Sequence, residues 1–457
     1  MARAELADLD REPAPARPRP PRAPSGRKLV PWIGPGLVWM VSAVGTGSVL
    51  FTPRVASEYR YTLLWVLLGV CALMWVMIRE AARYSIVTGD SLLEGFDHLP
   101  GPRHWAVWVI LVPQVVAAVA GIAGLASVAG SAFGTALGGD HRHWGAGLIT
   151  VAAVLVITDG YRIVERGARV LAGVLVAITV VAAVGVAPSP GDLATGLVPS
   201  LPSDPDLYVI VPWIGTILAG SMGIVWFSYW TAARGYGGRS ALSEQGEDED
   251  PTEAFDDEER RRRLADWIRT MSWAAGLGVI AGTVVLVSYM VLGAELLAPE
   301  GILPEGEDVA GDLSRLLSDV WGRTGFWLMI LSITVAIGGS VFANQDGWGR
   351  SFADMTLIVR GGRSVWGLGR RRLTMLYVAT VTGLVPLGVV LTVSDPVAIM
   401  SVSGLVAALH TPFIVGLILL VNRRQLPAGL RPGVAIGSLM VLSAVLYAGV
   451  GVLQLAS

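Results

Sequence analysis

The stretch "SAVGTGSVLFTPR", residues 42–54, decides the fold. It places two glycines, two threonines, two serines and a proline where an apolar helix would otherwise run straight. At about 1.5 Å per residue from Pro31, the glycines fall near the middle of a bilayer. Glycine tolerates unwound backbone, and backbone groups freed at that depth must face protein or a water-lined cavity. The stretch therefore predicts a membrane helix that is broken beside a cavity.

The composition is typical of a polytopic membrane protein. Of the 457 residues, 53% are hydrophobic and only 15% are charged. Long runs without ionisable side chains recur along the chain, as helices embedded in hydrocarbon require. The single cysteine, Cys71, excludes an internal disulfide and a cysteine-based metal cluster.

Apolar windows between charged or Pro/Gly-rich breaks predict eleven membrane spans. They lie near residues 31–54, 61–78, 105–137, 144–158, 168–187, 207–231, 267–297, 324–345, 373–393, 397–421 and 432–455. Lys and Arg fall mostly in alternate loops, which predicts a cytoplasmic N-terminus and a C-terminus outside the cell membrane. We therefore expect an all-α membrane protein with one transmembrane transporter domain over residues 31–457.

Two segments are hydrophilic. Residues 1–30 are rich in proline and arginine and are predicted to be a disordered cytosolic tail. Residues 235–263 include "SEQGEDEDPTEAFDDEERRRR", residues 243–263, and are predicted to be a charged cytosolic loop. The acidic part, residues 244–259, is given no function.

A second break is predicted in span six. The stretch "GTILAGSMGIVWFSYW", residues 215–230, places Ala219–Gly223 in the middle of an apolar helix. Two interrupted helices, five spans apart, indicate inverted repeats with a binding site between them at the midplane. The repeats would cover about 31–187 and 207–421, with 432–455 as an extra helix. The alternative is that the small residues only allow close helix packing.

Several motifs resemble one family. "GPGLVWMVSAVGTGSVLFTPRVASEYRYTLLW" (34–65), "AARYSIVTGDSLLE" (81–94), "FANQDGWGRSFAD" (342–354) and "ALHTPFIVGLILLVNRRQ" (408–425) are similar, in order and spacing, to segments of the Nramp family. Its members are proton-coupled divalent-metal transporters. The resemblance implies a LeuT-like 5+5 inverted repeat of eleven transmembrane helices, with helices one and six broken at the midplane.

The resemblance also implies a site, and the site residues differ from the family pattern. The family's Asp-Pro-Gly-Asn break in helix one falls on Gly45, Thr46, Gly47 and Ser48. In helix six, the methionine of its Met-Pro-His break falls on Ala219 or Met222, and the histidine on Ser221 or Ile224. The helix-ten glutamine matches His410. The family's helix-three acids have no counterpart, because residues 105–139 contain none.

The candidate substrate-binding residues thus lack a carboxylate. They are Gly45, Thr46, Gly47, Ser48, Ala219, Gly220, Ser221, Met222 and His410. Met222 and His410 are candidate metal ligands if a metal binds at all. His410 is also the candidate for proton coupling, and the alternative is that it caps a carbonyl freed by Pro412. Asn344 and Gln345, at the cytosolic end of span eight, are predicted to act in gating or coupling.

The sequence therefore predicts a secondary transporter that moves a metal or another small cation by alternating access, with or without proton coupling. The alternative cargo is a small neutral or zwitterionic organic solute, because hydroxyls, carbonyls and helix ends suit such a molecule as well. A channel or a sensor fits less well, since no charged ring is present. No catalytic constellation is found, so neither an enzyme nor a cofactor is expected. Expected partners are the solute, protons and the lipid bilayer, but not nucleic acid, and no protein partner is assigned.

Overall fold

The computed structural model describes residues 20–29, 32, 36, 39–40, 47–158, 161–218, 220–237, 257–363 and 367–456. For residues 161–170 and 455–456 it describes only the backbone. The elements within these ranges are helices, in agreement with the predicted all-α class.

The long helices follow the predicted spans. They are α2 (Ser48–Tyr59), α3 (Leu64–Thr88), α5 (Trp105–Leu137), α6 (His141–Ile157), α7 (Tyr161–Val186), α10 (Gly220–Arg234), α11 (Asp257–Leu292), α12 (Val309–Ser332), α13 (Gly338–Val359), α16 (Pro396–Gln425) and α17 (Val434–Ala456). The shorter α-helices are α4 (Leu92–Asp97), α8 (Pro190–Gly196), α9 (Leu207–Thr216), α14 (Arg370–Ala379) and α15 (Val385–Thr392).

Six short segments have other helical geometries. Three 3₁₀ turns lie at η1 (Gly26–Leu29), η4 (Ala298–Glu300) and η7 (Ala428–Leu430). Three π-helical segments, η3 (Gly293–Leu297), η5 (Ile333–Ile337) and η6 (Thr380–Leu384), lie at the end of α11 and at the α12–α13 and α14–α15 junctions. A π-segment locally widens a helix and often marks a functional region.

Fewer spans are found than the eleven predicted. Within the described residues, eight helical stretches are long and apolar enough to cross a membrane, or nine if the pair Leu171–Val186 and Pro190–Gly196, bent by 113°, counts as one span. The fourth predicted span is α6, an apolar helix of only 17 residues. Most of residues 31–46, in the first predicted span, lies outside the described residues.

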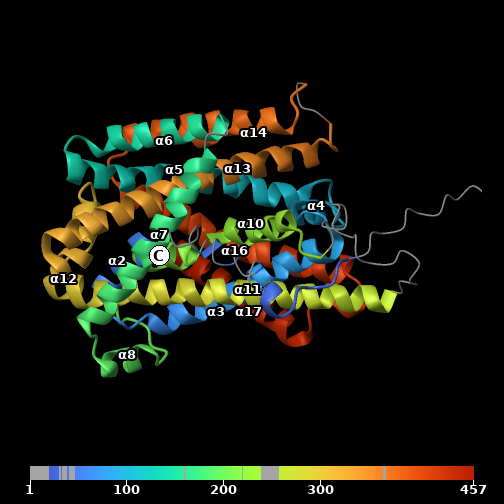
Figure 1. Ribbon diagram of the computed structural model, residues 1–457, viewed down its shortest axis with the longest axis horizontal. Helices are drawn as coiled ribbons and strands as arrows, with labels where there is room; N and C mark the ends of the chain where they lie inside the picture. Colours follow the sequence, from blue (N-terminus) through green and yellow to red (C-terminus); the bar gives the residue numbers. More distant parts are fainter. Residues whose placement is uncertain are drawn as a thin grey trace, which may run out of the picture.

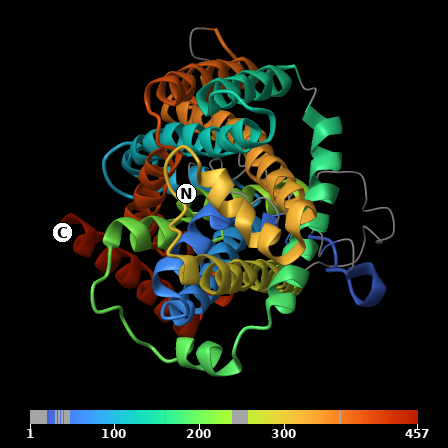
Figure 2. The same ribbon diagram turned by 90° about the vertical axis from the view of Figure 1, so that its left-hand side faces the viewer.

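The helices form two packed groups joined by α16. In Figure 1, α5, α6, α13 and α14 lie along one edge of the molecule, and α3 and α11 lie along the opposite edge. Helix α16 packs against α5 in the first group and against α3, α9 and α10 on the other side. Figure 2 shows the same bundle from its left-hand end. The predicted breaks fall in the second group, beside α16.

Glycine brings helix backbones into contact. A Cβ on Gly36 would lie 1.9 Å from the carbonyl oxygen of Ala274, and one on Gly215 would lie 1.9 Å from that of Gly404. Lipid gives apolar helices little reason to associate, so close van der Waals contact between small residues stabilises such packing. Glycines outside the two predicted breaks therefore serve as packing positions.

Parts of the two hydrophilic segments are described. Residues 20–29, assigned to a disordered tail, pack on α11, where Arg263 and Trp267 donate hydrogen bonds to the carbonyls of Pro20 and Pro21 at 3.2 and 2.8 Å. Helix α11 begins at Asp257, inside the stretch predicted to be a loop. The i,i+4 ion pairs Glu258–Arg262 and Glu259–Arg263 stabilise this extension. Residues 1–19 and 238–256 lie outside the described ones.

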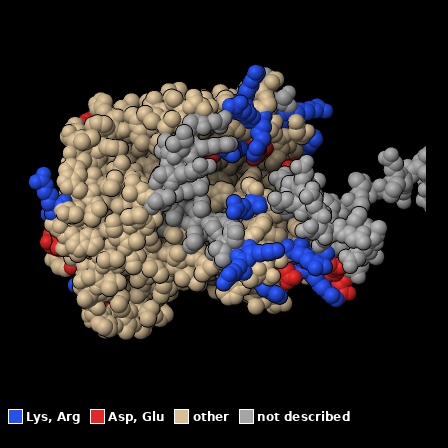
Figure 3. Space-filling model, viewed as in Figure 1, with Lys and Arg blue, Asp and Glu red and all other residues tan. Residues whose placement is uncertain are grey.

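On the face drawn in Figure 3, charged side chains gather toward the two ends of the molecule. In Figure 3, Lys and Arg gather at the end that carries residues 20–29 and the start of α11, a smaller charged group lies at the other end, and the surface between them is almost free of charge. An uncharged belt between two charged rims is what a lipid bilayer requires.

Candidate functional site

The first break begins α2. Gly47 has φ 131°, a conformation that side-chain-bearing residues rarely adopt, and its carbonyl accepts the backbone N–H groups of Leu50 and Phe51 at 3.1 and 2.8 Å. Ser48, predicted to be unwound, is instead the first residue of α2, and Gly47 is the N-cap residue. Gly45 and Thr46 lie outside the described residues.

The second break lies earlier than predicted. Helix α9 ends at Thr216 and α10 begins at Gly220, so the non-helical residues are Ile217 and Leu218 rather than the whole of Ala219–Gly223. Ser221 and Met222 are helical and buried. Ala219 lies outside the described residues.

Packing explains the position of the second break. Leu218 has φ 64°, which costs a residue with a Cβ about 1–2 kcal/mol. Its side chain is fully buried against Gly282, and burying a leucine gains about 1.5–3 kcal/mol. The contact therefore offsets the backbone strain. Gly220, at φ 61°, then starts α10 with little strain.

The two broken spans contact each other crosswise. The indole of Trp39, before the first break, donates to the carbonyl of Gly223 in α10 at 3.3 Å. The indole of Trp213, in α9, donates to the hydroxyl of Thr52 in α2 at 3.2 Å. Each half of span one is thus hydrogen-bonded to the opposite half of span six.

Helix α16 lies against both breaks. A Cβ on Gly47 would lie 3.1 Å from Cε of Met400 in α16 and 3.3 Å from the side chain of Thr216. Gly215 meets Gly404 backbone to backbone, and Gly220 approaches Ala407. Three chain segments that are far apart in sequence therefore meet at the breaks.

A buried polar cluster lies beside the second break. Nε2 of Gln114, in α5, donates to Oγ of Ser221 at 2.8 Å and also contacts Nδ1 of His410. Nε2 of His410 lies 3.1 Å from the carbonyl oxygen of Val109. All three side chains of the cluster are buried, with Gln114 only 1% exposed. The cluster joins α5, α10 and α16.

These contacts define the protonation of His410. An amide NH₂ only donates and a carbonyl oxygen only accepts, so Nδ1 holds a lone pair and Nε2 carries the hydrogen. The imidazole is therefore neutral, and both of its nitrogens are engaged. His410 bonds to another helix and not to the carbonyl that Pro412 frees within its own helix.

The predicted site residues fall at two levels. Gly47 and Ser48 lie level with Met400, whereas Ser221 lies level with His410, and ten residues of one helix span about 15 Å. His410 thus lies near the second break but not near the first, contrary to the expectation from sequence. A single small ion does not touch both levels at once in this arrangement.

Two buried oxygens near the breaks have no hydrogen-bond partner among the residues that the structure describes. They are Oγ of Ser48 and Oε1 of Gln114. Within the described residues, no group of three or more His, Cys, Asp or Glu side chains lies close enough to hold a metal ion. The described side chains of the site therefore offer neutral oxygens and one imidazole, and both nitrogens of that imidazole already have hydrogen-bond partners.

Asn344 and Gln345 lie in a different part of the fold. Gln345, fully buried in α13, donates to the carbonyls of Ile149 in α6 and Thr382 in η6 at 3.3 and 2.8 Å. Asn344 donates to the carbonyl of Ser340 in its own helix at 2.8 Å. Neither makes a described contact with the polar cluster, and Gln345 ties three scaffold helices together.

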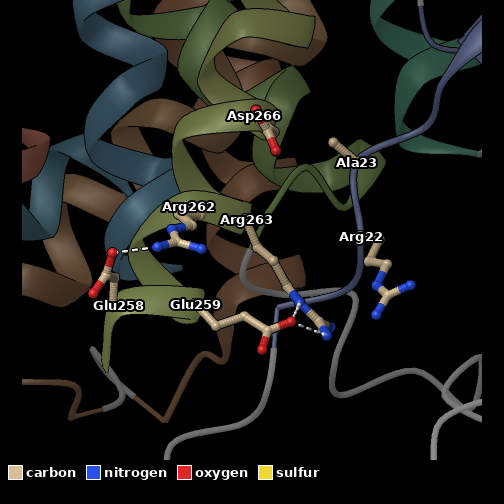
Figure 4. A pocket seen from close by; sticks show the side chains of 7 residues that line it. All are labelled: Arg22, Ala23, Glu258, Glu259, Arg262, Arg263 and Asp266. Atoms are coloured by element: carbon tan, nitrogen blue, oxygen red, sulfur yellow. Dashed lines mark hydrogen bonds and ion pairs between the residues drawn. The ribbon is translucent and has the colours of Figure 1, made fainter. Parts of the chain in front are cut away.

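A hollow of about 560 Å³ lies between residues 22–23 and the first turns of α11. Figure 4 shows two ion pairs in its wall, Glu258 with Arg262 and Glu259 with Arg263. Acidic and basic groups alternate there and pair within one helix. The hollow therefore shows no preference for ligands of either charge.

Sequence reasoning missed Gln114. The search of helix three was for acidic residues, and residues 105–139 have none. The signal was present, because Gln114 is a lone amide next to Pro113 in an otherwise apolar run. A polar residue at that depth is costly unless it has partners inside the protein.

Comparison with known proteins gives consistent results. The family model "Natural resistance-associated macrophage protein-like" (Nramp) matches residues 36–457. A divalent metal cation transporter from Burkholderia ambifaria is 30% identical over 82 residues, which are 18% of this chain and 19% of that protein. Protein Malvolio from Drosophila melanogaster is 32% identical over 91 residues, 19% of this chain and 15% of that protein. These matches span less than a fifth of each relative's length.

Solved structures share the fold over most of the chain. A variant of the Eremococcus coleocola manganese transporter aligns with a TM-score of 0.66 and 14% identity, covering 96% of this chain and 90% of its own. Mhp1, a nucleobase-cation-symport-1 family transporter, aligns with a TM-score of 0.55 and 13% identity, covering 91% and 90%. At these identities the likeness shows the fold alone, that of a multi-span helical membrane protein.

Proposed function

Because this multi-pass membrane protein belongs to the Nramp family, we propose that it is a secondary transporter that carries a metal or another small cation by alternating access. The observation that carries the proposal is the meeting of two helix breaks with α16 inside a membrane bundle. Unwound backbone in a membrane needs protein or a water-lined cavity around it, and transporters bind cargo at such places.

The proposal includes the finer architecture. The eleven predicted spans would form a LeuT-like 5+5 repeat over about 31–187 and 207–421, with 432–455 as an extra helix, a cytoplasmic N-terminus and an outside C-terminus. The crosswise contacts of Trp39 and Trp213 support it, since equivalent halves of two repeats would contact each other reciprocally. The alignment of 96% of the chain with a manganese transporter structure supports the same topology.

A metal cargo is supported by the relatives, one of which is described as a divalent metal cation transporter. The site itself favours weak and unselective binding. A divalent ion that leaves water prefers carboxylate or imidazole ligands, and the residues here are neutral amides and hydroxyls. We therefore expect Mn²⁺ to be carried with little selectivity over other cations.

The test is Mn²⁺ uptake into proteoliposomes. Ser221→Ala removes the hydroxyl that holds Gln114 and is expected to reduce uptake at least tenfold. Ser228→Ala is the matched control. Ser228 lies buried on the same helix, and its hydroxyl donates to the carbonyl of Val225 within that helix. Uptake that is absent in the unmodified protein, or equal in both variants, would contradict the proposal.

A second candidate cargo is a small neutral or zwitterionic organic solute. The absence of a carboxylate among the described residues of the site favours it. Thermal unfolding of the purified protein with Mn²⁺ or with neutral amino acids separates the two. A midpoint raised by an amino acid and unchanged by Mn²⁺ would favour the organic cargo, since a ligand of the folded state stabilises it.

A further inference from the structure

We propose that Gln114 is a cargo-binding residue, which holds His410 and Ser221 with its amide nitrogen and offers its own amide oxygen to a cation. The proposal deepens the proposed function and depends on it for the nature of the cargo. No motif of the sequence and no resemblance pointed to this position, and the geometry alone assigns it.

The amide nitrogen of Gln114 is fully used. An NH₂ group has two hydrogens, and Nε2 has two acceptors, Oγ of Ser221 at 2.8 Å and Nδ1 of His410. These contacts fix the orientation of the carboxamide, because both neighbours are on other helices. The side chain is thus held by α10 and α16 while it is anchored on α5.

The amide oxygen is left without a partner. Oε1 of Gln114 is buried and accepts no hydrogen bond from the described residues. An unsatisfied buried carbonyl costs about 1–3 kcal/mol. A cation that approaches Oε1 would replace the missing partner, and amide oxygens are ordinary ligands of hard cations. Because this amide oxygen is neutral, it does not strongly favour divalent over monovalent cations.

Gln114 also excludes His410 as a ligand. Both imidazole nitrogens are engaged, by Gln114 and by the carbonyl of Val109, so His410 can bind a metal or a proton at Nδ1 only if Gln114 moves away. Removing the amide would leave Nδ1 of His410 without its hydrogen-bond donor. A carboxylate at position 114 can only accept a hydrogen bond, so it would not donate to Nδ1 as the amide does.

The first experiment is calorimetry with Mn²⁺ on purified protein. Gln114→Glu adds a carboxylate of the same shape and is expected to bind Mn²⁺ at least tenfold more tightly than the unmodified protein. In a His410→Gln background, Gln114→Leu removes the oxygen without freeing an imidazole, and it is expected to bind Mn²⁺ at least tenfold more weakly than His410→Gln alone. Ser403→Ala is the control, because Ser403 makes another α16–α5 hydrogen bond, to the carbonyl of Ala117, two turns from His410. Unchanged affinity in both Gln114 variants would overturn the proposal.

The second experiment does not depend on the cargo. In protein labelled with ¹⁵N-histidine, the His410 signal is identified by its loss in His410→Gln, and it should show a bare Nδ1 and a protonated Nε2. Gln114→Leu should alter this pattern, because Nδ1 loses its hydrogen-bond partner, and Ser403→Ala should change nothing. An unaltered His410 signal in Gln114→Leu would overturn the role of Gln114. An altered signal with no Mn²⁺ flux in the unmodified protein would instead refute the proposed metal cargo alone.

Discussion

At the scale of single residues, His410 shows how one contact changes an interpretation. From sequence it was either a site residue or a cap for a carbonyl beside Pro412. The structure places it in a network between helices, with Gln114 on one nitrogen and Val109 on the other. Sequence does not reveal this, because the partners lie about 300 positions away along the chain.

His410→Gln is expected to keep the fold and to flatten the pH dependence of uptake. Glutamine can still bond to Gln114 and Val109, but it has no proton to exchange near neutral pH. Uptake into proteoliposomes at several pH values measures the effect. His143→Gln is the control, because the His143 side chain is 79% exposed outside the spans. A pH profile that is unchanged in His410→Gln would remove His410 from proton coupling.

Asp140 gives a second residue-scale prediction. It caps the start of α6, and hydrogen bonds first from the side chain and then from the backbone of Arg142 lower its pKa to about 2. The folded pKa lies below the unfolded value of about 3.9, so its stabilisation is complete above about pH 4 and is lost as pH falls through about 2. Asp140→Ala should therefore lower the unfolding midpoint equally at pH 5, 6 and 8. A difference that shrinks between pH 8 and pH 5 would contradict this assignment.

At the scale of elements, span six is the informative case. The glycines of "AGSMG" predicted a break close to the right place, but the unwound residues are Ile217 and Leu218. Local helix propensity predicts the region in which a helix breaks, and tertiary packing determines which residues there are non-helical. Here the choice follows from Leu218, whose burial against Gly282 outweighs its strained backbone.

Gly215→Ala is expected to destabilise the fold. Its Cβ would lie 1.9 Å from the carbonyl oxygen of Gly404, so α9 and α16 would have to separate. Overpacking of this kind costs about 1–3 kcal/mol, or more where only backbone can move. Gly416→Ala, on α16 with nothing within 4 Å of its Cβ, should gain about 0.5–1 kcal/mol as an ordinary helix position. Unfolding midpoints in detergent measure both, and equal midpoints would show that the close contact does not exist.

At the scale of the whole molecule, hydropathy and charge predicted most of the fold. The spans reappear as helices because length and apolarity are local properties of the sequence. The packing of α16 between two helix groups, the ordering of residues 20–29 and the helical start of α11 at Asp257 were not predicted. Each depends on contacts between distant segments, such as that of Trp267 with Pro21.

The orientation is tested by labelling single cysteines. Cys71 is buried, and Cys71→Ala leaves a chain without cysteine. Arg103→Cys, in the exposed loop before α5, should react with an impermeant maleimide only from the cytosolic side. Ser189→Cys, at the exposed start of α8, should react only from outside. Labelling of both from one side would mean that the span count between them is wrong.

The polar cluster of Gln114, Ser221 and His410 consists of an amide, a hydroxyl and a neutral imidazole, so it carries no charge of its own. Moving one elementary charge through 100 mV changes its energy by about 2.3 kcal/mol, so within this cluster the membrane voltage acts only on the ion that is held. The return of the empty carrier is therefore expected to be electrically silent, and the whole voltage dependence of the cycle belongs to its loaded steps. Transient currents recorded in the absence of any transported ion would show that a charged group outside the polar cluster moves during this return step.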